Sequence, residues 1–551
     1  MKCSISIFDD RLKVVSGYSP ILVERFRAIP GAKPHYLDGK FAFWTFPVMP
    51  DTVLMITDVC GILPGMLDAD VRAVIAEHIK TPEAKRQVDL SVINGHEFKT
   101  EPYEHQRVNL ARTMSEDRWL FADEQGTGKS FPLCNRLKMM DYSSKFLIIC
   151  PRSVCPGWIE QLKDHAELDA TIISGNPAVK QRKLRESGRI VIAGYETVLS
   201  MEADFLAIPW DAMILDEVQK VKNFTAKVSK CIRKLSEKID RVWALSGTPA
   251  PNGLEDWFGV ISAIDPTLLP VTTKTAFEAR YCFKARIGGD GPWKIAGYRN
   301  VGELHGYINS ISSRVTKKEA LDLPDKVISA RYVEMEGDQK RVYKELKNDA
   351  VARINHWKEA GQLTARNILS EQLRLLQIVG GFVPSDDGKM YEFPDKCKIS
   401  AIRDLTDEVG DKQVVIWAAF VAETEFLAKW LDKEYGGGVA TLTGKMNDAD
   451  RNLNIDSFKR GDARWFVGMA GSGGVGINGL QVCDTEFYYS RNFRMDYWKQ
   501  SQDRCHRLGV KNTVSVVKII CQGSVDVRVD ERLDEKDAQM NMMLCEPEDI
   551  L

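Results

Sequence analysis

Short apolar runs alternate with polar loops and helical stretches over most of this chain, and that rhythm leaves few folds open. From Tyr103 to about Asp265, the runs FLIIC, RIVIAG, DAMILDE and RVWALSG each precede polar loop residues and a helical stretch. The rhythm returns after residue 395 in QVVIWAAF, VATLTG, RWFVGMA, TEFYYS and VSVVKII. Apolar strands joined by helices are typical of parallel sheets covered on both faces. The sequence therefore predicts an α/β protein with two doubly wound lobes.

Two further segments complete the expected organisation. Residues 340–379 carry apolar residues at three- and four-residue spacing, which predicts helices. The first 95 residues alternate short β-like runs with a turn-rich centre, which predicts a small α+β domain. We expect four parts: an N-terminal module at 1–95, a first lobe at 96–325, a helical insertion or linker at 326–395, and a second lobe at 396–551.

The charges of the chain nearly cancel, because 75 lysines and arginines are matched by 77 aspartates and glutamates. A surface that binds nucleic acid therefore has to be a local basic patch. The closest cysteines, Cys150 and Cys155, have neither zinc-hairpin nor thioredoxin-like spacing, which favours reduced thiols. Neither an apolar signal core nor a run of about 18 apolar residues occurs in the sequence. We expect a cytoplasmic protein, from a prokaryote or from a virus in its host, or a nuclear protein if it is eukaryotic.

The segment DEQGTGKS has the composition of a phosphate-binding loop. Gly126, Thr127 and Gly128 would let backbone N–H groups surround phosphate oxygens, Lys129 would neutralise their charge, and Ser130 would ligate Mg²⁺. Position 124 is Glu, where a strict Walker loop has Gly. Taken alone, the segment is also compatible with a glycine turn that begins a helix.

Acidic and hydroxyl residues follow the next two predicted strands. Asp216 and Glu217 end the run ILDE, where an ATPase needs one carboxylate to hold Mg²⁺ and another to polarise the attacking water. Ser246 and Thr248 follow the run VWAL and are candidates to link the nucleotide site to a bound polymer. The alternatives are a solvated strand end for the acids and a simple turn before Pro249 for the hydroxyls.

Two arginines mark the end of the second lobe. Arg504 and Arg507 are three residues apart, so on a helix they share one face. A solvated basic face is the alternative, but a phosphate loop in the other lobe favours arginine fingers that reach the γ-phosphate. His506 is expected to pack or form hydrogen bonds, because no second His or Cys stands at metal spacing.

In their order along the chain, these motifs resemble the superfamily-two helicase-like ATPases, and among them the Swi/Snf (sucrose-non-fermenting-two) type. The resemblance covers about residues 100–530 and implies two RecA-like lobes. LDLPDK at 321–326 also resembles the link between the motor halves of this type. The eight motifs that carry the resemblance are DEQGTGKS, ICPRSVCPGWIEQ, IAGYETVL, ILDEVQKVKN, LSGTPAPNGLEDWF, VVIWAAF, GMAGSGGVGINGLQVCDT and QSQDRCHRLG.

The resemblance implies ATP and Mg²⁺ as cofactors and adds roles for individual residues. Gln106 would read adenine, Ser130 and Asp216 would hold the metal, and Glu217 would activate water. The second lobe would contribute Gly476, Gln500, Arg504 and Arg507. The sequence departs from the family pattern at Gln219, where His is usual, and at Val510, where Gln is frequent. Neither departure removes a charge that the chemistry needs.

The N-terminal module is similar to the HepA-related (HARP) domain that accompanies fork-remodelling members of this type. The likeness rests on Phe26, Pro30, Gly31, Trp44, Phe46 and Pro47. Strand alternation would place Phe41 and Phe43 on one face and Trp44 and Phe46 on the other. One pair is then expected in the core, and the other is a candidate base-stacking surface. Basic residues near these aromatics are Arg25, Arg27, Lys33 and Lys40.

The implied function is an ATP-dependent double-stranded-DNA translocase that remodels branched DNA, for example by fork regression or strand annealing. The expected partners are duplex and branched DNA, with replication or recombination proteins as further candidates, and the expected state is a monomer. One alternative is a strand-separating helicase or the motor of a restriction or defence assembly. A non-enzymatic alternative is an ATP-gated DNA-binding switch.

Overall fold

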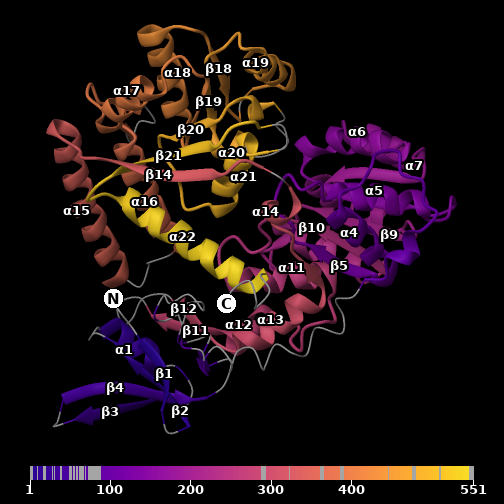
Figure 1. Ribbon diagram of the computed structural model, residues 1–551, viewed down its shortest axis with the longest axis horizontal. Coiled ribbons are helices and arrows are strands. Elements are labelled where there is room, and N and C mark those ends of the chain that lie inside the picture. The colour runs from indigo at the N-terminus through magenta and orange to yellow at the C-terminus, as the bar shows by residue number, and fades with distance from the viewer. Residues whose placement is uncertain are drawn as a thin grey trace.

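A computed structural model describes most of the chain: residues 4–48 with short interruptions, scattered positions between 52 and 71, and the ranges 88–286, 293–321, 323–359, 365–384, 390–444, 446–473, 479–507 and 510–544. Two parallel sheets of seven and six strands and an antiparallel sheet of four strands organise these residues. Figure 1 shows lobe 1 in purple and magenta, lobe 2 in orange and yellow, and the N-terminal module in indigo. Within the described residues, no helix has the length and apolar character needed to span a membrane.

Lobe 1 is built on the seven-stranded sheet, in the order β13-β5-β10-β9-β6-β8-β7. Every pairing in it is parallel. Its strands are β5 (Arg118–Phe121), β6 (Phe146–Cys150), β7 (Thr171–Ile173), β8 (Ile190–Gly194), β9 (Ala212–Asp216), β10 (Arg241–Leu245) and β13 (Ser312–Ser313). Its main helices are α4 (Glu104–Ser115), α5 (Ser130–Met139), α6 (Cys155–Ala166), α7 (Pro177–Arg185), α8 (Tyr195–Ser200), α9 (Glu202–Leu206), α10 (Lys227–Ser236), α11 (Trp257–Ile264), α12 (Lys274–Tyr281), α13 (Val301–Ser310) and α14 (Lys317–Ala320).

Strand β6 illustrates why the apolar runs fold in this way. All five of its residues are buried, and they alternate between two hydrophobic clusters. Ile148 belongs to the cluster that contains Trp158 of α6, whereas Leu147 belongs to the cluster that contains Ile232 of α10. Helices therefore cover both faces of the sheet, as the continuous apolar runs predicted. A hairpin, β11 (Cys282–Arg286) and β12 (Trp293–Tyr298), is appended to this lobe.

Lobe 2 is built on the six-stranded sheet, in the order β14-β21-β20-β17-β19-β18, again with parallel pairings only. Its strands are β14 (Lys326–Val333), β17 (Val414–Ala418), β18 (Val439–Leu442), β19 (Trp465–Met469), β20 (Thr485–Tyr488) and β21 (Val514–Cys521). The remaining elements are α15 (Gly337–Glu359), α16 (Ala365–Val379), β15 (Phe382–Pro384), β16 (Met390–Glu392), α17 (Cys397–Val409), α18 (Val421–Tyr435), α19 (Asp448–Arg460), α20 (Ala470–Gly473), α21 (Met495–Cys505) and α22 (Val525–Leu544). The range 326–395, predicted as helical, thus begins with an edge strand of this sheet.

The two lobes touch through their last segments. Helix α22 leaves lobe 2 and packs against α13 of lobe 1, as Figure 1 also shows. Arg314 Nη2 of lobe 1 donates a 3.0 Å hydrogen bond to Asn541 Oδ1 of α22. Strand β13, just before Arg314, is the outermost strand of the lobe 1 sheet. The chain therefore leaves lobe 1 beside the strand β5 that leads into DEQGTGKS.

The N-terminal module is an antiparallel sheet, in the order β1-β2-β4-β3, with one described helix. Its elements are β1 (Ser4–Phe8), β2 (Arg11–Val15), α1 (Pro20–Arg27), β3 (Lys33–Leu37) and β4 (Lys40–Pro47). Trp44 and Phe46 are buried, with ring centroids 5.9 and 5.6 Å from Phe26 of α1. Residues Pro30 and Gly31 lie outside the described residues.

The predicted pairing of Phe41 with Phe43 on one face is wrong. Phe43 stacks on His35, with ring centroids 4.8 Å apart, on the face away from the core. Phe41 is partly buried against the core cluster, 5.7 Å from the ring of Trp44. The register of β3 against β4 shifts between His35 and Tyr36, which breaks the alternation at this point.

Candidate active site

The phosphate loop joins the carboxyl end of β5 to the first residue of α5. Gly126 and Gly128 have φ values of +88° and +81°, which side chains with a Cβ rarely adopt. A Cβ at Gly128 would also collide with the amide of Gln106. Thr127 is buried, and its Oγ1 donates a 2.9 Å bond to the carbonyl oxygen of Glu124. The backbone of this loop is therefore held in the curled form that the composition predicted.

Lys129 is fixed at the base of the loop. Its Nζ donates 2.8 Å hydrogen bonds to the carbonyl oxygens of Asp123 and Glu124. Burial lowers the pKa of Lys129, against the opposing effect of Asp123 and of the acids Glu217 and Asp216. Burial also raises the pKa of Asp123 to about 6, against the effect of Lys129. A buried cation among carboxylates suits the binding of a phosphate chain that brings its own counter-cation.

Gln106 sits over the phosphate loop from the first turn of α4. Its Oε1 accepts a 3.0 Å bond from the backbone N–H of Tyr103, and its Nε2 donates a 3.2 Å bond to the carbonyl oxygen of Thr127. His105 Nε2 lies 2.8 Å from the same carbonyl oxygen. Gln106 is thus positioned beside the phosphate loop; its contact with adenine stays a prediction.

Asp216 is the last residue of β9 and Glu217 directly follows it, at the same edge of the sheet as the loop. Asp216 Oδ2 accepts a 2.9 Å bond from Trp158 Nε1. Burial, and after it the neighbouring Glu217, raises the pKa of Asp216 to about 7. Glu217 has a left-handed backbone (φ +54°, ψ +54°), an uncommon conformation for a residue with a side chain. This turn directs the two successive carboxylates into one site.

Glu217 is tied to the next motif by Gln219, the residue that departs from the family pattern. Gln219 Nε2 donates to Glu217 Oε2, and its Oε1 accepts a 2.6 Å bond from Ser246 Oγ. Ser246 Oγ in turn accepts a 3.0 Å bond from the backbone N–H of Thr248. The amide of Gln219 therefore bridges Glu217, directly after β9, and the hydroxyl of Ser246, directly after β10. These hydrogen bonds connect the two motifs within lobe 1; the predicted link from Ser246 and Thr248 to a bound polymer stays a prediction.

Three polar residues of lobe 2, Gln500, Arg504 and Arg507, lie close to the phosphate loop and the acids of lobe 1. Gln500 of α21 donates a 3.4 Å bond from Nε2 to Glu217 Oε2. Burial, and after it the like charge of Arg507, lowers the pKa of Arg504 to about 10. Helix α21 ends at Cys505, so Arg507 lies beyond the helix and the predicted common helical face is wrong. Both arginines nevertheless line one cavity with the phosphate loop.

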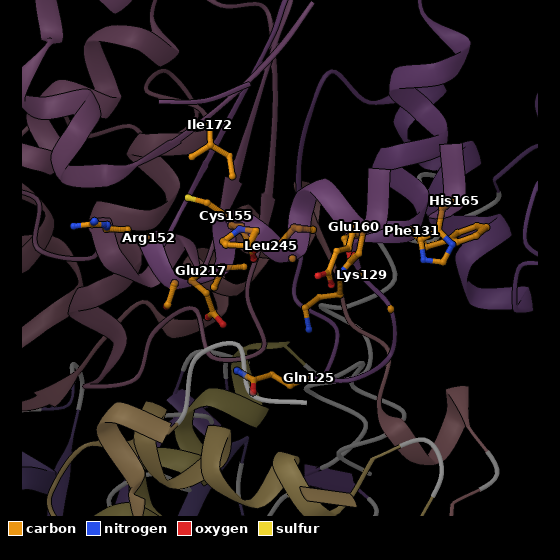
Figure 2. A pocket seen from close by; sticks show the side chains of 18 of the residues that line it. Gln125, Lys129, Phe131, Arg152, Cys155, Glu160, His165, Ile172, Glu217 and Leu245 are labelled. Carbon is orange, nitrogen blue, oxygen red and sulfur yellow. The ribbon is translucent and has the colours of Figure 1, made fainter. Parts of the chain in front are cut away.

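That cavity has a volume of about 1750 Å³ and lies between the lobes. Figure 2 shows the side chains of Lys129 and Glu217 extending into it from lobe 1. The residues of the predicted site that line it are Gln106, Gly126, Gly128, Lys129, Ser130, Asp216, Glu217, Arg504 and Arg507. Gly476 lies outside the described residues. A lysine and two arginines together with two acids have the charges that suit a polyanion with a metal ion.

The donor set fits Mg²⁺ only together with a nucleotide. Within the described residues, no three His, Cys, Asp or Glu side chains are grouped so as to hold a metal ion themselves. Asp216 and Ser130 offer two oxygens, and Ser130 Oγ donates to Gln161 Oε1. Mg²⁺ prefers six oxygens and is commonly shared between one or two protein ligands, phosphates and water.

Sequence reasoning gave no role to three residues at this site. Asp123 and Trp158 stand inside motifs that carry the resemblance, but their partners Lys129 and Asp216 become apparent only in the fold. Lys317 comes from a polar segment that matches none of the motifs, yet its Cε lies 3.5 Å from where a Cβ on Gly126 would stand.

His506 Nε2 lies 2.9 Å from the carbonyl oxygen of Pro324, which confirms its predicted hydrogen-bonding role.

Comparison with protein families gives two matches. Residues 103–380 match the SNF2-related domain, and residues 397–509 match the helicase conserved C-terminal domain. The first match covers the phosphate loop and both acids, and the second covers Gln500, Arg504 and Arg507.

Similar proteins are long and distant in sequence. A putative ATP-dependent helicase/translocase of Bacillus subtilis, YwqA, is 24% identical over 458 residues, covering 79% of this chain and 48% of the relative. The ISWI chromatin-remodeling complex ATPase ISW1 of Saccharomyces cerevisiae is 25% identical over 464 residues, covering 79% of this chain and 40% of the relative. The chain thus spans about half the length of these curated relatives, or less. A Sulfolobus solfataricus SWI2/SNF2 ATPase core in complex with dsDNA is 23% identical, with 84% of this chain and 98% of that chain covered and a TM-score of 0.39.

Proposed function

Because the chain belongs to the SNF2-related family, we propose that it hydrolyses ATP in order to move along double-stranded DNA and to remodel branched DNA. The observation that carries this proposal is the shared cavity. Lobe 1 contributes the phosphate loop with Lys129 and the acids Asp216 and Glu217, and lobe 2 contributes Arg504 and Arg507. Residues from two lobes around one anion site make nucleotide binding and lobe closure interdependent.

The residues divide the chemistry of hydrolysis between them. The backbone of the loop and Lys129 bind the β- and γ-phosphates, and Gln106 contacts the base. Glu217 orients and polarises the attacking water, and Arg504 and Arg507 stabilise the charge that develops on the γ-phosphate. Asp216 and Ser130 would hold Mg²⁺, which neutralises phosphate charge when it is bound. Release of phosphate removes the anion that holds the arginines, so that the lobes open once in each cycle.

Basic side chains from both lobes line the same cavity, and we assign DNA binding to them. Arg152, Lys180 and Lys183 line it from lobe 1, and Arg451 of α19 lines it from lobe 2. Arg152 lies in the loop 151–154 and is exposed, so it is accessible to a DNA phosphate. Contacts of this kind address phosphates, so translocation is expected to be independent of sequence.

The N-terminal module is the candidate for recognising the shape of a fork. Its four strands contain no Asp or Glu, and they carry Arg11, Lys13, Lys33 and Lys40. On the face away from the core, Lys13 Nζ lies 4.4 Å from the ring centroid of Phe43, which stacks on the exposed His35. Cations beside aromatic rings are suited to the backbone and the bases of an unpaired strand. This face supports a role in fork recognition that contacts to duplex phosphates alone would not supply.

The translocase proposal predicts how ATPase activity responds to DNA. Turnover is expected to be low without DNA, to rise strongly with duplex DNA, and to rise at least as much with forked DNA. Raising the salt concentration should weaken stimulation by all DNA structures in parallel, because phosphate contacts release counterions. The measurement is steady-state ATP hydrolysis with no DNA, single-stranded, duplex and forked DNA. Stimulation by single strands alone would favour a strand-separating helicase, and binding without turnover would favour an ATP-gated switch.

A second prediction concerns the N-terminal module. The truncation should end at residue 87 and not at 95, because Ile93 packs with Leu110 in the core of lobe 1. Removing residues 1–87 is expected to leave duplex-stimulated ATPase activity within about twofold of the full-length rate, because the deleted strands belong to a separate sheet. Fork regression and strand annealing are expected to be lost. Lys13→Ser in the full chain, on the exposed face, should weaken fork preference without disturbing Trp44 and Phe46. Equal fork remodelling by all three proteins at matched salt would show that the module has a different role.

A further inference from the structure

Lys317 occupies a position between the phosphate loop and the arginine segment. The strand that leads to it runs beside the strand that leads to the loop: the N–H of Ala122 bonds to the carbonyl oxygen of Ser313, and that of Glu124 to Val315, at 2.8 and 2.9 Å. The backbone N–H of Lys317 then donates a 2.9 Å bond to Glu124 Oε2. Lys317 is thereby held in lobe 1 at the start of helix α14.

The side chain of Lys317 reaches across to lobe 2. Its Nζ donates a 2.6 Å bond to Asp503 Oδ1 and a 2.5 Å bond to the carbonyl oxygen of His506. Asp503 precedes Arg504, and His506 precedes Arg507. The ammonium group of Lys317 therefore binds the two residues that directly precede Arg504 and Arg507 in the chain.

The surroundings of this contact set it apart from a surface ion pair. The side chains of Lys317 and Asp503 are 6% and 15% exposed. Burial favours a higher pKa for Asp503, but the ammonium groups of Lys317 and Lys326 outweigh it, so that the pKa lies below its usual value. A buried pair is costly to break, because the remaining charge has no compensation. Two buried acceptors at short distance fix the ammonium group in one place.

The consequence concerns the distance between Arg507 and the loop. A Cβ placed on Gly126 would lie 3.5 Å from Lys317 Cε and 3.8 Å from Arg507 Cγ. Lys317 and Arg507 therefore pack side by side over the same glycine of the phosphate loop. The hydrogen bonds of Lys317 to Asp503 and to the backbone at His506 therefore help to set the separation between Arg507 and the loop.

We propose that Lys317 is a positioning residue for ATP hydrolysis, which holds Arg504 and Arg507 at the distance from the phosphate loop that the reaction needs. This inference rests on the proposed ATPase function. Lys317 acts through Asp503 and the backbone at His506, and it does not itself contact the transferred phosphate. A displacement of about 1 Å in such a constellation costs up to roughly 10²-fold in rate.

The first test compares Lys317→Met with Lys318→Met. Lys318 is the next residue in the same helix, and it is exposed. Lys317→Met is expected to lower the kcat of duplex-stimulated ATP hydrolysis about 10- to 100-fold, with less than a threefold change in KM for ATP and in the Kd for duplex DNA. Lys317→Arg should recover part of the rate, and Asp503→Asn should reproduce the loss. Thermal unfolding of each variant checks that the protein is folded.

A double-mutant cycle separates positioning from other roles. In a background that carries both Arg504→Ala and Arg507→Ala, Lys317→Met is expected to cause little further loss of kcat, because the residues that it positions are already absent. Full additivity of the two losses would overturn the proposal and indicate direct contact of Lys317 with the reacting groups. An unchanged kcat in Lys317→Met, or an equal fall in Lys318→Met, would overturn it as well. A wild-type protein without any ATPase activity would instead refute the proposed function.

Discussion

Arg507→Ala is expected to lower the maximal rate of duplex-stimulated ATP hydrolysis about 10³-fold, with little change in the affinity for ATP. Arg507 lies over Gly126 of the phosphate loop and lines the cavity between the two lobes. A guanidinium group at this place meets the charge that appears on the γ-phosphate during transfer, and not the charge that is already present in bound ATP. Its loss should therefore affect the transition state more than the ground state.

The measurement combines steady-state turnover at saturating duplex DNA with direct binding of a fluorescent nucleotide. Arg504→Ala is expected to behave in the same way, because the two arginines share the cavity. Arg528→Ala on α22, an exposed position outside the cavity, is the matched control. If the arginine variants bound DNA more weakly but kept the wild-type rate at saturating DNA, the two residues would belong to the DNA grip.

Glu217→Gln is expected to bind ATP normally and to hydrolyse it about 10²-fold more slowly, or worse. The amide keeps the shape of the carboxylate and can still contact Gln219 and Gln500, so the fold of the site should persist. It cannot polarise the attacking water as a carboxylate does. Lys129→Ala provides the contrast, because the loss of the loop cation should weaken nucleotide binding itself. Single-turnover hydrolysis and nucleotide binding, measured side by side, distinguish the two effects.

Wild-type turnover in both Glu217→Gln and Lys129→Ala would remove the basis for placing catalysis at this cavity. Weak binding in Glu217→Gln together with normal binding in Lys129→Ala would reverse the two assignments. Neither substitution is expected to change the fold, because Glu217 and Lys129 are outside the hydrophobic clusters of lobe 1.

The sequence predicted the parts of the fold that are fully buried. The run FLIIC is strand β6 and the run VVIWA is strand β17, and all residues of both strands are buried. Buried parallel strands need unbroken apolar runs, so they leave a clear signal. Strand β14 was missed because it is an edge strand: Val327, Ile328 and Tyr332 are exposed, and polar residues interrupt it. Strand β13 consists of two serines and has no apolar signal at all.

The candidate site was predicted as far as its chemistry is local in the sequence. The loop at Lys129 follows strand β5, and the acids Asp216 and Glu217 stand at the end of strand β9, so their place at one edge of the sheet could be predicted from the sequence. The contact of Lys317 with Asp503 joins residues 186 positions apart, across two lobes. No spacing rule predicts such a contact, because it depends on how the finished lobes meet. The helix end before Arg507 was missed for a similar reason: helix boundaries depend on tertiary packing.

The hydrogen bonds through Gln219 imply a thermodynamic linkage that acts in both directions. The Nε2 atom of Gln219 donates to Glu217, and its Oε1 atom accepts from Ser246. A ligand that moves one of these two residues therefore changes the free energy of binding a ligand at the other. If DNA bound near Ser246 raises the affinity for ATP by a given factor, bound ATP must raise the affinity for DNA by the same factor. If the proposed translocase activity holds, the increase in ATP affinity caused by DNA and the increase in DNA affinity caused by ATP would both measure one coupling free energy.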